Sequence, residues 1–357
     1  MNLTSACASV THRKEPILQP RLTWERITLK LRNPFRLSYG TSEERQAYWL
    51  RLENDEGWGE GTIPPYYHVD QSETEQVWQE AAQSILPFPE GVEDIGGWVG
   101  SAGPAPARCA LDLALHDRIG RKAGVPLYSL LDLPKPRVMQ SSFTIAIDSP
   151  GEMARMARQF AFFSILKIKL GGDGEDLERL AAIREARPEV KLRIDANAGW
   201  KVEDALRMVR ELERFDLEII EQPVAKEDIE GMGTVQAATS IPIVADESVQ
   251  TIENIEALGK AGVRGINLKL MKTGGLTPAV AMLKRARELG LKVMLGCMIE
   301  TSIGTTAMAH LAGLADWLDL DAPVLISNDP FDGMTFNESA SVSISDRPGI
   351  GVVLKNS

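Results

Sequence analysis

Three acidic residues each end a short apolar run of the sequence, and they recur at nearly equal intervals. They are Asp195 in KLRIDAN, Glu221 in EIIEQP and Asp246 in IPIVADES, with gaps of 26 and 25 residues. A buried strand followed by a helix and two loops takes about that many residues. The three carboxylates are therefore expected at the same end of successive βα units. There they would repel one another unless a divalent cation neutralised them.

Lysines flank the three carboxylates at a similar spacing. Lys167 and Lys169 lie in SILKIKL, one interval before Asp195, and Lys269 lies in GINLKL, 23 residues after Asp246. Taken singly, a charged residue at a strand end is more often a helix cap or a solvated group. The joint pattern over five consecutive strands instead predicts a metal centre with a proton-transferring lysine on either side.

Eight candidate strands alternate with helical stretches in the second part of the chain. They lie at residues 141–147, 164–170, 191–197, 217–223, 241–248, 265–270, 292–298 and 317–323. This alternation predicts an α/β fold, a (β/α)8-type barrel, whose active site lies at the carboxyl ends of the strands. An open doubly wound sheet would explain the alternation, but it gathers its ligands at one switch point. The helix after the last strand is not evident from the sequence.

The rest of the chain predicts a second module. We expect residues 1–20 to be a mobile extension, since they lack a signal peptide's apolar stretch. Residues 21–140 predict an α+β capping domain, and 324–357 are expected to complete it, which leaves 141–323 for the barrel. Within the cap, the segment 33–45 reads as a long polar loop between two strands.

Composition and charge narrow the classes of partner. The chain has 357 residues, of which 44% are hydrophobic and 25% charged, as in an ordinary soluble globular protein. The net charge of −11 argues against nucleic acid or an anionic membrane as partner. Three scattered cysteines indicate neither a disulfide framework nor a thiolate metal site, so we expect a reducing compartment, the cytoplasm. Assembly into homo-oligomers is left open.

Several motifs together resemble a known family. KIK, DANAGW, EQP, ADES and NLKLMKTGG, in this order, resemble the muconate-lactonizing subgroup of the enolase superfamily, and WGEG, ALHDRIGRKAGVPLYSLL and PGIGVVL resemble its capping domain. The resemblance implies one Mg²⁺ per subunit, with Mn²⁺ as a substitute, held by Asp195, Glu221 and Asp246. The ion would bind a substrate carboxylate and stabilise the enediolate that forms when the α-proton is removed.

Two lysines and two aspartates suggest the reaction. Lys169 and Lys269 on opposite faces of the enediolate fit inversion of a stereocentre by 1,1-proton transfer. Asp319 and Asp321 in WLDLDAP are two residues apart, hence on one face of a strand, where they could hold an α-ammonium group. This pair resembles the dipeptide epimerases, and it implies epimerisation of a dipeptide at its carboxy-terminal α-carbon. The remaining expected pocket residues are Lys167, Thr144, Asn197, Cys297 and Ile299.

One position departs from the family branch that epimerises alanyl-glutamate. The arginine expected to meet the glutamate side chain is replaced by Gly40. Arg36 or Arg45 would favour an acidic substrate side chain instead, whereas Glu43 and Glu44 would favour a cationic one. The tyrosines of this region, Tyr39, Tyr66 and Tyr67, would favour an apolar one.

Other reactions and roles also stay open. Within the superfamily, the alternatives are a cycloisomerase or an o-succinylbenzoate synthase, whose substrates carry no amine for the aspartate pair. Outside it, the alternative is a binding or scaffold barrel without catalysis, which would have no reason to keep three clustered carboxylates. Glu300 follows a strand end, and the sequence gives it no role.

Overall fold

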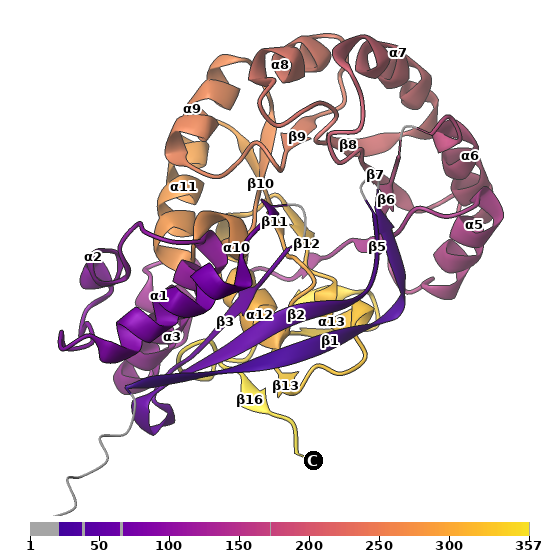
Figure 1. Cartoon of the computed structure of the whole chain (residues 1–357). Coiled ribbons are helices and arrows are strands. Elements are labelled where there is room, and N and C mark those ends of the chain that lie inside the picture. Colours follow the sequence, from indigo (N-terminus) through magenta and orange to yellow (C-terminus); the bar gives the residue numbers. More distant parts are fainter. Residues whose placement is uncertain (1–20, 38–39, 65–66, 172, 357) are drawn as a thin grey trace, which may run out of the picture.

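The chain forms a helix-covered antiparallel sheet seated against the open end of a parallel barrel (Figure 1). This is a computed structural model, and it describes residues 21–37, 40–64, 67–171 and 173–356. The predicted extension 1–20 lies outside the described residues. The first sheet has the order β1-β2-β3, and its elements are β1 (Leu22–Leu37), β2 (Gly40–Leu52), β3 (Trp58–Thr62), α1 (Gln71–Gln83), α2 (Ile95–Val99), α3 (Ala105–Ala123) and α4 (Leu127–Leu130).

Helix α3 lies directly against strand β3, and the WGEG motif explains how. A Cβ atom added at Gly59 would lie 1.9 Å from the carbonyl oxygen of Ala110 in α3, so only glycine allows this approach. Tyr48 and Leu50 of β2 then pack with Trp78 of α1 in one apolar cluster. The cap therefore has a core of its own beside that of the barrel.

The expected loop at 33–45 is wrong, because the structure continues the strand pairing through it. Strands β1 and β2 stay paired to their tips, with Phe35 opposite Ser42 and Leu37 opposite Gly40, and the register shifts between Lys30 and Phe35. Figure 1 shows this indigo hairpin as a long arm that reaches toward the strand ends of β5 to β7. Polar residues suit the arm because most of its side chains are exposed to water, whereas Phe35 and Leu37 are half-buried.

The barrel has eight parallel strands in sequential order, as the strand pattern predicted. A parallel bridge between Ser141 and Leu318 links the first strand to the last and nearly closes the barrel. The strands are β5 (Phe143–Ile145), β6 (Ile165–Lys169), β7 (Lys191–Asp195), β8 (Leu217–Glu221), β9 (Ile243–Ala245), β10 (Gly265–Leu268), β11 (Lys292–Gly296) and β12 (Trp317–Asp319).

Seven helices of eight residues or more connect these strands, and the eighth position differs. After β12 the described chain forms only α13 (Ala322–Leu325), a single turn, which is why the sequence showed no clear last helix. In the part of the chain that the structure describes, no helix is both long and apolar enough to cross a membrane. The connecting helices are α5 (Pro150–Gln159), α6 (Asp176–Ala186), α7 (Val202–Leu212), α8 (Ile229–Ala237), α9 (Ile252–Lys260), α11 (Leu276–Glu288) and α12 (Ser302–Ala309), and the one-turn α10 (Leu270–Thr273) precedes α11.

The barrel interior is layered, with apolar groups below and charged groups above. Ile219, Val244, Met294 and Trp317 form one buried cluster, and all but Met294 lie two residues before a charged residue of the upper layer. Side chains two residues apart on a strand face the same side. This spacing therefore places Glu221, Asp246 and Asp319 above the apolar cluster, at the carboxyl ends of their strands. The lower layer thus supports the site from beneath.

The end of the chain returns to both parts of the molecule. Strand β13 (Phe331–Asp332) pairs with β16 (Val353–Leu354), while β14 (Thr335–Phe336), β15 (Ser341–Ser343) and β4 (Met139–Gln140) form a small sheet. Residue Ile326 bridges Leu31 of β1, and the Ile350 amide donates to Asp117 of α3 at 2.8 Å. Because of these contacts, we propose that the capping domain comprises residues 21–140 and 324–357, with the barrel between residues 141 and 323.

One aspartate of the cap fastens α3 to the barrel. The Asp112 carboxylate accepts hydrogen bonds from the amides of Leu276 at 2.6 Å and Thr277 at 3.3 Å, which are the free donors at the start of α11. His116 lies 3.2 Å from the same carboxylate. Since all of these groups are buried or nearly so, the interaction ties the position of the cap to a barrel helix.

We predict that Asp112→Ala lowers the free energy of unfolding by about 1–3 kcal/mol, because buried amides lose their acceptor. Asp112→Asn keeps one acceptor oxygen and should lose less. Denaturant unfolding of the two variants beside the unchanged protein gives the comparison. Equal stability of Asp112→Ala and the unchanged protein would show that this carboxylate does not hold the two parts together.

Candidate active site

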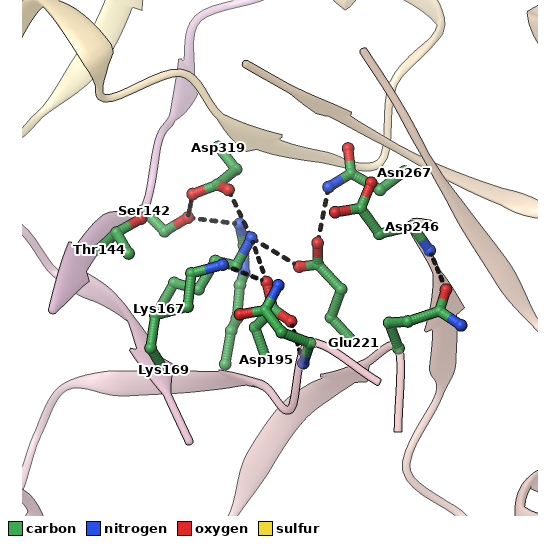
Figure 2. A network of polar contacts seen from close by, with 12 residues as sticks. Ser142, Thr144, Lys167, Lys169, Asp195, Glu221, Asp246, Asn267 and Asp319 are labelled. Carbon is green, nitrogen blue, oxygen red and sulfur yellow. Dashed lines mark hydrogen bonds and ion pairs between the residues drawn. The ribbon is translucent and has the colours of Figure 1, made fainter. Parts of the chain in front are cut away.

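Three buried carboxylates meet at the carboxyl ends of β7, β8 and β9. Asp195 and Glu221 are the last residues of their strands, and Asp246 directly follows β9. One oxygen of each lies within 4.8 Å of the others, and none of the residues is more than 2% exposed. Figure 2 shows the three side chains converging. The structure thus brings together the trio that the spacing predicted.

Hydrogen bonds from neighbouring residues fix the segments that carry the trio. Gln222 of the EQP motif accepts from the Asp246 amide at 2.8 Å, which fixes the start of that loop against the end of β8. Asn267 donates to Glu221 at 2.9 Å, and the Asn197 amide donates to Asp195 at 2.9 Å. The carboxylates of Glu221 and Asp195 are therefore oriented by these hydrogen bonds, and Gln222 fixes the backbone that carries Asp246.

Four lysines surround the trio. The Lys167 ammonium lies 3.1 Å from Asp195, 2.8 Å from Glu221 and 2.8 Å from Asp319, so it sits at the centre of the cluster. The other three lysines each contact one member of the trio: Lys169 lies 2.5 Å from Asp195, Lys269 lies 2.7 Å from Asp246, and Lys272 lies 2.5 Å from Asp246. The carboxylates are thus partly neutralised by the chain itself, in addition to any cation.

The surroundings shift the pKa values of the three carboxylates in different directions. Burial alone would raise the pKa of Asp195, but the charges of Lys169 and Lys167 outweigh burial and lower it to about 2. Burial and the charge of Asp195 raise the pKa of Glu221 to about 8. Asp246 behaves like Asp195, because Lys269 and Lys272 offset its burial and lower its pKa. Glu221 is therefore the member of the trio with the least compensated charge.

Lys169 and Lys269 face each other across the barrel. Lys169 ends β6 and Lys269 follows β10, and three strands separate them in either direction around the barrel. Both lysines line the same cavity. The strands β7, β8 and β9 that carry the trio lie between them on one side. A substrate atom in the middle of this cavity therefore has an ammonium or amine on each of two opposite sides.

The opposite wall of the cavity carries the two aspartates from the eighth strand, and the structure separates their roles. Asp319 accepts from Lys167 at 2.8 Å and from the Ser142 hydroxyl at 2.6 Å. Asp321 accepts from the Thr144 amide at 2.6 Å, and no cation of the described residues lies within ion-pairing distance of it. Burial and the charge of Asp319 raise its pKa to about 7. Asp321 is thus the carboxylate that still lacks a cationic partner.

The cavity is closed from above by the cap. The hairpin arm contributes Phe35, Leu37 and Arg45, and Tyr67 follows from the next loop. Arg36 does not line this cavity: its side chain is 51% exposed and lies 3.9 Å from Asp148. Every predicted pocket residue does line it, namely Thr144, Lys167, Asn197, Cys297, Ile299, Asp319 and Asp321.

The sequence offered arginines, glutamates and tyrosines as groups that could contact the substrate side chain, and two of these three kinds line the cavity. Arg45 and Tyr67 reach it, whereas Glu43 and Glu44 are exposed on the arm and absent from its lining. The remaining two tyrosines, Tyr39 and Tyr66, lie outside the described residues. The described lining thus offers one cation and several apolar groups toward the substrate side chain.

Sequence reasoning missed four groups of the site. Lys272 and Ser142 contact its carboxylates, Asn267 donates to Glu221, and Glu247 accepts from Asn197 at 3.1 Å. Asn267 could have been found, because it lies two residues before Lys269 on the same strand face. Glu300 is buried outside the cavity lining, and burial and the charge of Glu60 raise its pKa well above the usual value.

The donor set fits a hard divalent cation. Three carboxylates converge on one point, and oxygen-only ligands are the preference of Mg²⁺. Oxygen atoms of Glu247 and Asn197 beside the trio are buried without a hydrogen-bond donor, so this region has acceptor capacity to spare. Asp195, Glu221 and Asp246 would hold the ion.

Several known proteins are similar to this chain in both sequence and fold. A family model described as "Enolase C-terminal domain-like" matches residues 152–357. An L-Ala-D/L-Glu epimerase of Bacteroides thetaiotaomicron is 35% identical over 93% of this chain and 88% of its own length. A hydrophobic dipeptide epimerase of Enterococcus faecalis is 34% identical over 91% and 96%. The crystal structure of a dipeptide epimerase from Enterococcus faecalis V583, complexed with Mg and L-Leu-L-Tyr, matches with a TM-score of 0.86 at 32% identity and covers 93% of this chain and 99% of that one.

We predict that the protein binds one Mg²⁺ per chain and that Glu221→Gln weakens this binding by more than about tenfold, since even the loss of an outer partner typically costs that much. Calorimetric titration of the metal-free protein measures the affinity. Glu218→Gln is the matched control, because Glu218 lies on the same strand but contacts Arg193 instead of the trio. Equal affinity of Glu221→Gln and the control would remove Glu221 from the metal site.

Proposed function

The chain belongs to the enolase superfamily, as its strand-end motifs predicted, and we propose that it is a magnesium-dependent dipeptide epimerase. The relatives named above are isomerases that act on dipeptides, which is the predicted reaction class. The observation that carries the proposal is the placement of Lys169 and Lys269 on opposite sides of one cavity, with the carboxylate trio on the wall between them. The reaction would invert the α-carbon of the carboxy-terminal residue.

In the proposed reaction, the metal would stabilise charge and the lysines would transfer protons. When bound at Asp195, Glu221 and Asp246, Mg²⁺ would supply the positive charge that offsets the negative charge of the deprotonated substrate. One of the two lysines, as the free amine, removes the α-proton from its side. The other, as the ammonium, delivers a proton from the opposite side. The configuration inverts because the two lysines lie across the barrel from each other.

Asp321 is proposed as the group that receives the substrate's α-ammonium. The sequence assigned this role to Asp319 and Asp321 together, but Asp319 already contacts Lys167 at 2.8 Å. Asp321 lines the cavity without a cationic partner among the described residues. Its position opposite the trio suits a substrate that carries a carboxylate at one end and an ammonium at the other. A cycloisomerase or o-succinylbenzoate synthase substrate has no group for this carboxylate, which favours the dipeptide.

Location and assembly belong to the proposal as well. Cys109 and Cys297 are free thiols in the structure, which suits the reducing cytoplasm that composition suggested. The proposed partner is a small dipeptide, with neither nucleic acid nor a membrane, and homo-oligomers are compatible with it.

We predict that Lys169→Ala and Lys269→Ala each reduce kcat/KM for epimerisation by about a hundredfold to ten-thousandfold, the usual contribution of a positioned acid or base. Each variant should still exchange the α-proton of one substrate stereoisomer with D2O, because the other lysine remains. Proton NMR follows both processes, and Lys191→Ala, at the far end of β7, is the control. Exchange of the same stereoisomer by both variants would contradict the two-lysine scheme.

A further prediction concerns Asp321. N-acetylation of a good dipeptide substrate should lower kcat/KM by roughly 30-fold to several thousand-fold, since losing one partner of a buried charge pair costs about 2–5 kcal/mol. Asp321→Asn should depress turnover of free dipeptides and narrow the gap to the acetylated ones. Magnesium affinity should stay unchanged, because β12 lies across the cavity from the trio. Faster turnover of N-acylated amino acids or of succinylbenzoate precursors than of any free dipeptide would move the assignment to the alternative reactions.

A further inference from the structure

A second cavity lies beside the active-site cavity and shares part of its wall. The two cavities have Phe35, Thr144 and Leu325 in common. The roof of the second one is the tip of β1, from Arg32 to Arg36, and its floor is the outer side of β5 together with helix α5. Its volume is about 780 Å³ when the open solvent at its mouth is included.

The interior of this second cavity is apolar. Its deep lining comes from Phe143, Ile145, Met153, Met156 and Phe160. Phe143 stacks on Phe160 with ring centroids 3.9 Å apart, which fixes the wall between β5 and α5. Methionine side chains adapt their shape to an apolar partner at little cost. The interior therefore suits a large apolar group.

The charged residues that line this cavity already have partners, and Arg32 donates to the Val324 carbonyl at 3.1 Å. Arg36 lies 3.9 Å from Asp148, with both side chains about half exposed. Glu152 contacts Arg155 of the same helix at 2.5 Å. Exposed pairs of this kind add little binding energy for a charged ligand. The apolar lining, and not the paired charges, therefore determines which kind of group this cavity would bind.

The wall that the two cavities share lies next to the proposed ammonium site. The Asp321 carboxylate accepts from the Thr144 amide, and Thr144 belongs to both cavity walls. Leu325, the other shared residue of the barrel, ends the short helix that begins after Asp321. In a dipeptide, the ammonium and the first side chain branch from the same carbon atom. An ammonium held at Asp321 therefore places the first side chain at the entrance to the second cavity.

We propose that this second cavity receives the side chain of the substrate's amino-terminal residue, and that the enzyme prefers dipeptides in which this residue is large and apolar, such as leucine, methionine or phenylalanine. The inference rests on the proposed function and extends it to the substrate class. A methyl group from alanine would leave most of the cavity unfilled. The cap takes part in this choice because the tip of β1 forms the roof.

The test is a series of dipeptides with a constant carboxy-terminal residue and glycine, alanine, valine, leucine, methionine, phenylalanine or lysine at the amino terminus. Each buried methylene is worth about fourfold in affinity, so kcat/KM for leucine should exceed that for alanine by about 10- to 50-fold. Equal values for alanine and leucine, or a preference for lysine, would overturn the inference and leave the epimerase assignment standing. No epimerisation of any dipeptide would instead overturn the proposed function.

Two variants narrow the cavity from different sides. Ala146→Leu acts from the segment after β5 and Val324→Phe from α13, and both residues line the second cavity alone. In each variant the leucine-to-alanine ratio of kcat/KM should fall toward one. The matched control is Ala237→Leu, the same change at an exposed position of α8 across the barrel, which should keep the ratio. A ratio that stays high in both narrowed variants would place the first side chain elsewhere.

Discussion

The balance of buried charge at the carboxyl end of the barrel is the constraint on which the rest of the structure depends. Six carboxylates and four ammonium groups share this region: Asp195, Glu221, Asp246, Glu247, Asp319 and Asp321 with Lys167, Lys169, Lys269 and Lys272. Fully ionised, they leave an excess of two negative charges, which one divalent cation would offset. Isolated buried charges are very costly, so every member depends on its neighbours.

The barrel is suited to this arrangement because its strands enter the same space from all directions. The metal trio occupies three adjacent strands, the two lysines stand three strands apart on either side, and the ammonium site lies opposite the trio. In the proposed mechanism, the two charged ends of the substrate fix the direction in which it lies, and its α-carbon lies between the lysines. Inversion would then follow from the positions of the lysines around the barrel.

The cap and the barrel contribute to different properties. The groups proposed for catalysis all come from barrel strands and the turns directly after them, where neighbouring strands hold them rigidly. The hairpin arm adds residues to the walls of both cavities, with Phe35 at the border between them. Asp112 ties the two parts together at the start of α11. Changes in the arm can therefore alter substrate choice while leaving the charged cluster intact.

The sequence by itself determined the barrel, the metal trio and the two lysines. These features depend on local periodicity: a strand of alternating side chains, repeated at a fixed interval, puts each charged residue at a known end and on a known face. Asp195, Glu221 and Asp246 could be assigned in this way without knowing which strands are neighbours across the barrel.

Tertiary structure alone decided which of these charges are paired and how the pocket is shaped. From their spacing on the strand, Asp319 and Asp321 were expected to share one role. Packing across the barrel instead pairs Asp319 with Lys167, whereas Asp321 has no cationic partner among the described residues. Residues 33–45 read as a loop because most of their side chains are polar and exposed, and only the pairing of the two strands shows them to be an arm. Lys272 and the second cavity follow from contacts between segments far apart in the chain, and no periodicity within a single segment encodes such contacts.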